Sequence, residues 1–175
     1  VPVIFHNLRG YDGKIILKQY RKEAKGFCEK LSAIPNSSEK FLSFSIGSLR
    51  FIDSLQFMNA SLEKLASNLQ PGDFVHTRHL FPAEKVDLVL RKGVFPYEYW
   101  DSPARGEETQ LPPPSAFHSR LTGEGVSASD YAHGQRVWYE VGLKTLGQYH
   151  DLYLKTDVLI LADVFEKFRD MCMRH

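Results

Sequence analysis

A hairpin pattern in residues 40–55, KFLSFSIGSLRFIDSL, restricts the fold of this chain more than any other stretch. Apolar residues alternate with small polar ones on both sides of a Gly47-Ser48 turn, which is typical of two antiparallel strands. Residues 3–5 form an apolar strand that precedes a helical pattern. A hairpin beside a strand–helix unit favours an α/β fold with a mixed sheet over an all-parallel sheet.

Several stretches have helical periodicity, and the longest covers residues 145–172, where Tyr149, Tyr153, Ile160 and Val164 recur at helical spacing. The other predicted helices lie at residues 14–24, 59–69, around 83–91 and at 127–141. Gly26 fits the end of the helix at 14–24 and Gly142 the end of the helix at 127–141. A serine fits the start of the helix at 127–141.

Length and charge exclude some classes of protein. The 175 residues suffice for one domain with a sizeable core, and no apolar run approaches the ~20 residues of a membrane span. The formal charge is +1, so a nucleic-acid partner would need a local groove rather than a general basic field. Cys28 and Cys172 form no metal-binding spacing and suggest no disulfide framework, which favours an intracellular, reducing compartment, and the nucleus if the chain derives from a transposon in a eukaryote.

The stretch FHNLRGYDGKIIL ends a strand and begins a helix, and Asp12 lies where the helix starts. Asp is a favoured helix N-cap and Asn7 suits a turn, so a purely structural interpretation is available. In the functional interpretation, Asp12 points from a strand end into a crevice, where a carboxylate can bind Mg²⁺. Asn7 and His6 would then lie beside it, in reach of a phosphate or sugar.

The stretch YLKTDVLIL places Tyr153 and Asp157 four residues apart, so both side chains lie on one helix face. A carboxylate facing an apolar core is costly unless it is paired or bound to a metal ion, so Asp157 is either a rim residue or a metal ligand. Two-metal hydrolysis of phosphodiesters needs several carboxylates, and a tyrosine hydroxyl can orient the attacking water. Asp12 and Asp157 could supply two carboxylates, and the chain contains no Asp-x-Glu pair to supply more.

Two stretches closely resemble exonuclease motifs of family B DNA polymerases. IFHNLRGYDGKIIL resembles the second motif, of the Asn-x-x-x-Asp type, and YLKTDVLILADVFE resembles the third, Tyr-x-x-x-Asp. DSLQFM is similar to a Ser/Thr-Leu-x-x-hydrophobic motif that binds single-stranded primer DNA, and KGVF followed by PY is similar to a Lys-x-x-hydrophobic motif. These motifs have the character of the protein-primed branch, which includes certain phages, linear plasmids, adenoviruses and Maverick/Polinton DNA transposons.

The resemblance implies roles for individual residues. Asp12 and Asp157 would be metal ligands for Mg²⁺ or Mn²⁺, Tyr153 would orient the attacking water, and Lys92 would assist catalysis near the scissile phosphate. The residues that would hold an unpaired 3′ end of DNA are His6, Asn7, Tyr11, Ser54, Leu55 and Tyr97. The two carboxyl groups would converge on one cation-binding cleft.

Structural alternatives stay open for three of these residues. Ser54 could cap a strand end and Leu55 could be a core residue. Tyr97 could simply pack in an aromatic cluster with its neighbours Phe95, Tyr99 and Trp100.

The resemblance also implies a fold and a domain organisation. Residues 1–175 would form a ribonuclease H-like 3′–5′ exonuclease domain, N-terminally truncated, with a loop and helix insertion at 98–148. The Asp-x-Glu motif and the polymerase palm motifs are absent, so we expect a fragment that is inactive alone and has an unpaired sheet edge at residues 3–5.

The partners would be single-stranded 3′ ends of DNA and, for the parent polymerase, a terminal protein primer, without a membrane. The alternatives are a non-catalytic, transposon-derived remnant that binds single-stranded DNA, and an interaction module with no nucleic-acid role.

Overall fold

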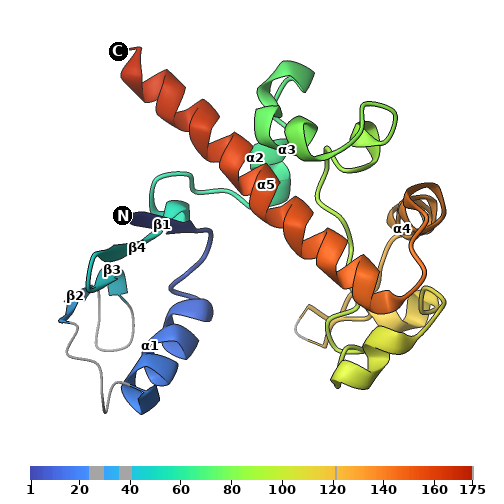
Figure 1. The fold of residues 1–175 in the computed structure, drawn as a ribbon, viewed down its shortest axis with the longest axis horizontal. Helices are drawn as coiled ribbons and strands as arrows, with labels where there is room; N and C mark the ends of the chain where they lie inside the picture. The colour runs from blue at the N-terminus through green and yellow to red at the C-terminus, as the bar shows by residue number, and fades with distance from the viewer. Residues whose placement is uncertain (24–29, 36–40, 121, 175) are drawn as a thin grey trace. The chain divides into compact units, whose positions relative to one another are not determined.

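The computed structural model describes residues 1–23, 30–35, 41–120 and 122–174. They form two compact units, Val1–Ser61 and Leu62–His175 (Figure 1). Gly26, the predicted end of the first helix, lies outside the described residues.

Four strands of the described residues form a mixed sheet in the first unit. In order across the sheet they are β1 (Pro2–Phe5), β4 (Leu49–Asp53), β3 (Phe41–Ile46) and β2 (Leu31–Pro35). β1 runs parallel to β4, whereas β4, β3 and β2 are antiparallel to their neighbours. Gly47 in the β3–β4 turn has φ 55°, a left-handed conformation that glycine adopts without steric cost. The predicted hairpin and the mixed α/β sheet are confirmed, and β1 lies at one edge among the described strands.

Helix α1 (Asp12–Glu23) supplies apolar side chains to the core of the first unit. Phe44 and Phe51 face each other across the β3–β4 pair and stack with ring centroids 4.6 Å apart. Ile16 and Leu17 of α1 pack against this pair. Since strand side chains alternate between the two faces of a sheet, these contacts define the face that α1 covers.

Helix α5 (Leu146–Met173) is the central element of the second unit. Helices α2 (Leu62–Ala66) and α3 (Val75–Leu80) lie along it (Figure 1). Helix α4 (Ala128–Val141) joins the same core. The buried core of this unit consists of Val86, Leu88, Val89, Phe95, Val137, Trp138, Leu146, Tyr149 and Tyr153. None of the helices in the described part of the chain is long and apolar enough to span a bilayer.

The ends of α4 and α5 have the expected capping residues. Ser127 accepts a hydrogen bond from the backbone of Asp130, and Gly142 closes α4 with φ 82°. Thr145 accepts from the backbone of Gln148 at the start of α5. These contacts satisfy backbone groups that a helix leaves unpaired at its ends.

The other helical segments are shorter. Where a helix was predicted around 83–91, the structure has only a single 3-10 turn at Val86–Leu88. The further 3-10 turns are Ser54–Gln56, Pro71–Asp73, Pro103–Glu107 and Pro114–Phe117.

Helix α3 is fixed by a residue of α5. Asp163 is 1% exposed. Its carboxylate accepts hydrogen bonds from the backbone N–H groups of His76 at 2.7 Å and Thr77 at 3.1 Å, and from the Thr77 hydroxyl at 2.6 Å. Asp163 thus caps α3 from a position that is distant in the sequence.

The irregular segment after Tyr97 is braced against the start of α5. Arg105 lies over the ring of Tyr99, 4.1 Å from its centroid, and pairs with Glu108 at 2.9 Å. The Glu108 carbonyl accepts a hydrogen bond from the backbone N–H of Leu146 at 2.7 Å. Although this segment has little regular structure, side-chain and backbone contacts hold it in place.

Candidate functional site

The site residues predicted from the sequence form two groups, one in each unit. The first unit contains His6, Asn7, Tyr11, Asp12, Ser54 and Leu55. The second contains Lys92, Tyr97, Tyr153 and Asp157.

The strands bring the first group to one end of the sheet. β1 and β4 are parallel, and the last residue of one, Phe5, pairs with the last residue of the other, Asp53. The chain segments that follow these two strands therefore leave the sheet side by side. In open α/β sheets this end of the strands is where ligands bind.

Asn7 lies in a tight turn directly after β1. It has φ 68°, and asparagine is one of the few side chains that tolerate this left-handed conformation. Its carbonyl accepts a hydrogen bond from the backbone of Gly10 at 3.0 Å. A Cβ at Gly10 would lie 2.7 Å from Asn7 Oδ1, so the side chain of Asn7 is folded over this glycine.

Asp53 fixes this turn, although the motif DSLQFM, which begins with it, gave it no role. Its side chain is fully buried, and Oδ1 accepts from the backbone N–H groups of Asn7 at 2.8 Å and Leu55 at 3.0 Å. Oδ2 accepts from the backbone N–H of Arg9 at 3.1 Å. The Arg9 Nε lies 3.8 Å from the same oxygen. One carboxylate therefore ties the segment after β1 to the segment after β4.

His6 makes a second link between the same segments. Its Nε2 lies 2.8 Å from the carbonyl of Ala60, and its Nδ1 lies 2.9 Å from the Ser54 hydroxyl. Because a carbonyl can only accept, Nε2 donates, and in the neutral ring Nδ1 accepts the Ser54 proton. Ser54 is fully buried and its hydroxyl is used by His6, whereas Leu55 is half-buried. A direct contact of Ser54 with DNA stays a prediction.

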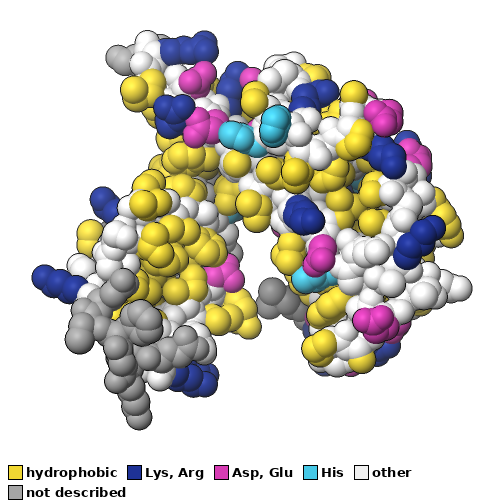
Figure 2. Space-filling view, viewed as in Figure 1, with side chains coloured by type: hydrophobic (Ala, Val, Ile, Leu, Met, Phe, Trp, Pro, Cys, Tyr) yellow, Lys and Arg dark blue, Asp and Glu magenta, His cyan; other side chains and the backbone are white. Residues whose placement is uncertain are grey.

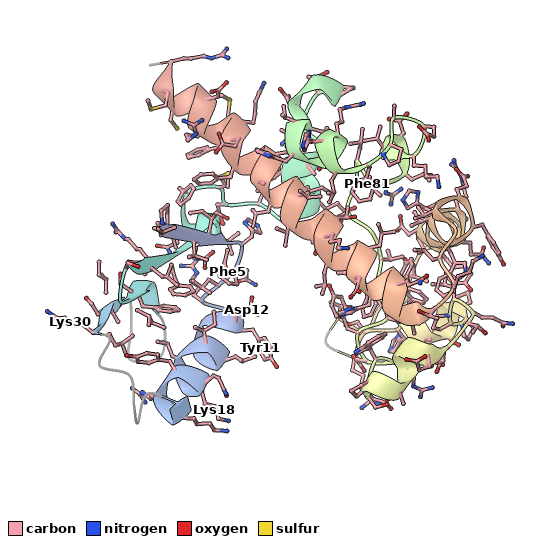
Figure 3. All side chains as sticks on the ribbon, viewed as in Figure 1. Phe5, Tyr11, Asp12, Lys18, Lys30 and Phe81 are labelled. Carbon is pink, nitrogen blue, oxygen red and sulfur yellow. The ribbon has the colours of Figure 1, made fainter. Side chains whose placement is uncertain are left out.

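Asp12 is the first residue of α1, and its side chain is exposed (Figure 3). A carboxylate in the first helical turn interacts favourably with the helix dipole, which fits the structural interpretation of this residue. Tyr11, directly before it, is 70% exposed. Both side chains are accessible to a ligand of the first unit.

Tyr153 and Asp157 lie one turn apart on α5, as their spacing predicted. The hydroxyl of Tyr153 lies within hydrogen-bond distance of the Tyr97 hydroxyl, and Tyr153 is near enough to Asp157 to influence the pKa of its carboxyl. Either hydroxyl of this tyrosine pair can be the donor. One carboxylate oxygen of Asp157, Oδ1, is buried and has no hydrogen-bond partner among the described residues.

Burial changes the acidity of both groups. It raises the pKa of the Asp157 carboxyl, and the positive charge of Lys92 together with the Tyr153 hydrogen bond opposes this change. Burial also raises the pKa of the Tyr153 phenol, and the hydrogen bond with Tyr97 adds to the effect. Tyr153 therefore stays protonated at neutral pH and can act as a hydrogen-bond donor.

The segment with Lys92 and Tyr97 is held against α5 by aromatic packing. The hydroxyl of Tyr149 donates to the Val94 carbonyl at 2.7 Å. Phe95 lies against both Tyr149 and Tyr153, with ring centroids 6.3 and 5.4 Å apart. Of the expected neighbours, Phe95 packs against Tyr97, and Tyr97 also contacts the ring of Tyr153, whose hydroxyl it meets.

A cavity of about 300 Å³ opens beside these residues. Its lining includes Lys92, Phe95, Tyr97, Tyr153 and the loop residues Ser119, Thr122, Glu124 and Gly125. Acidic residues, among them Glu63 and Glu124, also line it, so it is not uniformly basic. On the face of the molecule drawn in Figure 2, basic and acidic side chains are likewise interspersed.

Asp157 fits the role of a metal ligand in its chemistry. Its buried Oδ1 has no partner among the described residues, and a divalent cation would offset the charge of the ionised carboxylate. Carboxylate oxygens are the ligands that Mg²⁺ prefers. Within the described ranges, no three His, Cys, Asp or Glu side chains gather closely enough to hold a metal ion.

Tyr153 and Lys92 line one cavity, and Asp157 lies one helical turn from Tyr153 on α5. The model of a protein family described as DNA polymerase type B, organellar and viral, matches residues 1–174. The chain therefore belongs to this polymerase family, and the membership supports a role in a DNA-directed DNA polymerase and in DNA replication. The alternative of a non-catalytic remnant is not favoured by this match. No curated protein and no solved structure matches the chain.

Proposed function

We propose that the chain is the ribonuclease H-like 3′–5′ exonuclease domain of a protein-primed type B DNA polymerase, of the kind found in Maverick/Polinton elements, phages and linear plasmids. Its task is to remove mispaired primer ends during DNA replication. The observation that supports this proposal most is the free, buried oxygen of Asp157 beside the Tyr153 hydroxyl. In a structural carboxylate, both oxygens would normally be paired.

In this proposal Asp12 and Asp157 are ligands for Mg²⁺ or Mn²⁺. The bound cations would supply an activated water and stabilise the leaving oxygen of a phosphodiester. Tyr153, kept protonated by burial, orients the attacking water through its hydroxyl. Lys92 is close enough to Asp157 to change its pKa, and its charge offsets that of the scissile phosphate.

The DNA contacts come from both groups of residues. Tyr11 and Tyr97 are 70% and 66% exposed, and their rings can stack on unpaired bases without reading sequence. The other proposed contacts are His6, Asn7, Ser54 and Leu55. A mispaired end costs less to unpair than a matched one, which directs such ends to the site. A terminal protein primer would be a partner of the parent polymerase.

Binding and cleavage of a single-stranded oligonucleotide by this chain test the proposal. We expect binding that weakens as salt rises and that is stronger for a single strand than for a blunt duplex. Because the chain has no Asp-x-Glu pair, we expect at most slow cleavage, dependent on Mg²⁺ or Mn²⁺ and abolished in Asp12→Ala and Asp157→Ala. Equal binding of duplex and single strand, or cleavage that persists in Asp157→Ala, contradicts the proposal.

A further inference from the structure

We propose that Asp53 is a positioning residue for the DNA-binding surface of the first unit, acting through the conformation of the Asn7 turn. This inference rests on the proposed function, which supplies the ligand. Asp53 does not contact DNA in this account, because its side chain is fully buried. It determines where the residues that follow β1 and β4 are placed.

The contacts of Asp53 span both DNA-binding segments. Its two oxygens accept from the backbone N–H groups of Asn7 and Arg9 after β1, and of Leu55 after β4. Asn7 and Arg9 lie 46 and 44 residues from Asp53 along the chain, whereas Leu55 lies only 2 residues from it. A single side chain therefore holds two chain segments in one register at the end of two parallel strands.

A carboxylate suits this position better than an amide does. All three backbone groups are donors, and an ionised carboxylate offers acceptors only. An asparagine would place its NH₂ group against at least one of these donors. In that variant either Arg9, or both Asn7 and Leu55, would lose the hydrogen bond to the side chain.

The conformation at Asn7 makes the surface sensitive to this loss. Asn7 has φ 68°, a sparsely populated conformation that surrounding contacts must maintain. Its backbone N–H is bound to Asp53 and its side chain lies over Gly10. Release of the turn allows Asn7 to return to a commoner conformation, which moves its amide away from its position over Gly10.

A matched control separates positioning from general stabilisation. Asp163 is also a buried carboxylate that accepts three hydrogen bonds, two of them from backbone N–H groups. It lies in the second unit, where it caps α3, and it has no role in the proposed DNA contacts. Asp163→Asn therefore reproduces the chemical change of Asp53→Asn at a purely structural position.

The experiment measures the affinity of the wild-type chain, Asp53→Asn and Asp163→Asn for a labelled single-stranded oligothymidylate of about ten nucleotides. Fluorescence anisotropy is recorded at several salt concentrations, at a temperature where circular dichroism shows each protein folded. We expect Asp53→Asn to weaken binding about tenfold, with an unchanged salt dependence because no phosphate contact is removed. Asp163→Asn should lower the melting temperature and leave the affinity within about twofold of wild type.

Gly10→Ala provides a second variant if Asp53→Asn does not fold. Its Cβ displaces the Asn7 side chain while Asp53 stays intact, and we expect a loss of affinity in the same direction. Wild-type affinity in Asp53→Asn or in Gly10→Ala, or an equal loss in Asp163→Asn, overturns the inference. If the wild-type chain itself does not bind the oligonucleotide, the proposed function is wrong, and the inference falls with it.

Discussion

The hydroxyl of Tyr97 lies 2.5 Å from the hydroxyl of Tyr153, which lies one helical turn from Asp157 on α5. An exposed tyrosine thus contacts a buried one that stays protonated. Two segments of the second unit, the loop after Lys92 and the first half of α5, meet at this contact. The relationship supports a site in which one ring remains free to stack on a base while the other presents its hydroxyl.

Removal of the Tyr149 hydroxyl should reduce stability more than removal of the Tyr97 hydroxyl does. Tyr149→Phe leaves the Val94 carbonyl without its partner, and we expect a loss of about 1–3 kcal/mol in the free energy of unfolding. Tyr97→Phe removes a contact at an exposed ring, so we expect a loss of about 0.5 kcal/mol. Urea unfolding of the two variants measures the difference, and a larger loss for Tyr97→Phe would contradict this account.

Gly134 provides space for the Tyr149 hydroxyl. A Cβ at Gly134 would lie 3.1 Å from that oxygen, so Gly134→Ala should push the hydroxyl away from the Val94 carbonyl and destabilise the protein by about 1 kcal/mol. In the Tyr149→Phe background, the same change should instead stabilise α4 by up to about 1 kcal/mol, because alanine favours helix over glycine. A double-mutant cycle in urea checks this reversal of sign. An equal cost in both backgrounds would show that the hydroxyl is not involved.

Asp157 should reduce stability at neutral pH. Burial raises the pKa of the Asp157 carboxyl in the folded protein above its value in the unfolded chain. The stability that the protonated carboxyl allows is therefore fully present below the pKa of the unfolded state, and it is lost as pH rises through the pKa of the folded state. We therefore expect Asp157→Asn to raise the melting temperature at pH 7, with a gain that shrinks as the pH is lowered. Asp151→Asn, at an exposed carboxylate on the same helix, is the control and should leave the melting temperature nearly unchanged. A lower melting temperature of Asp157→Asn at pH 7 would rule out this account of the carboxyl.

Asp163 should be important for the stability of the second unit. Asp163→Ala leaves two backbone N–H groups and the Thr77 hydroxyl without their acceptor, and we expect a loss of about 2–4 kcal/mol. Hydrogen exchange should show that the amides of α3 lose protection before the rest of the second unit. Uniform loss of protection across that unit would contradict a local capping role.

The elements that the sequence predicted correctly carry their signals locally. Ser127 and Gly142 mark the two ends of α4, and Gly47 marks the turn of the hairpin. By contrast, α3 was missed because its cap is Asp163, 86 residues away from Thr77. β2 was also missed, since its described side chains, from Leu31 to Ile34, are all exposed and show no alternation.

The same distinction applies to the candidate site. The contact of Tyr153 with Asp157 was predictable because four residues make one helical turn. The role of Asp53 in linking two segments was not predictable, since only its hydrogen bond with Leu55 is local and its partners Asn7 and Arg9 belong to another segment. The hydrogen bond that occupies Ser54 arises from the pairing of β1 with β4, which also required the fold.

The central claim is that Asp12 and Asp157 are both ligands for divalent cations. Mn²⁺ binding to the wild-type chain, Asp12→Asn, Asp157→Asn and the control Asp151→Asn, measured by electron paramagnetic resonance of free Mn²⁺ at pH 7.5, tests it most directly. We predict that each of the first two variants loses at least about tenfold in Mn²⁺ affinity while Asp151→Asn binds as wild type does. Wild-type affinity in Asp12→Asn or in Asp157→Asn would contradict the claim.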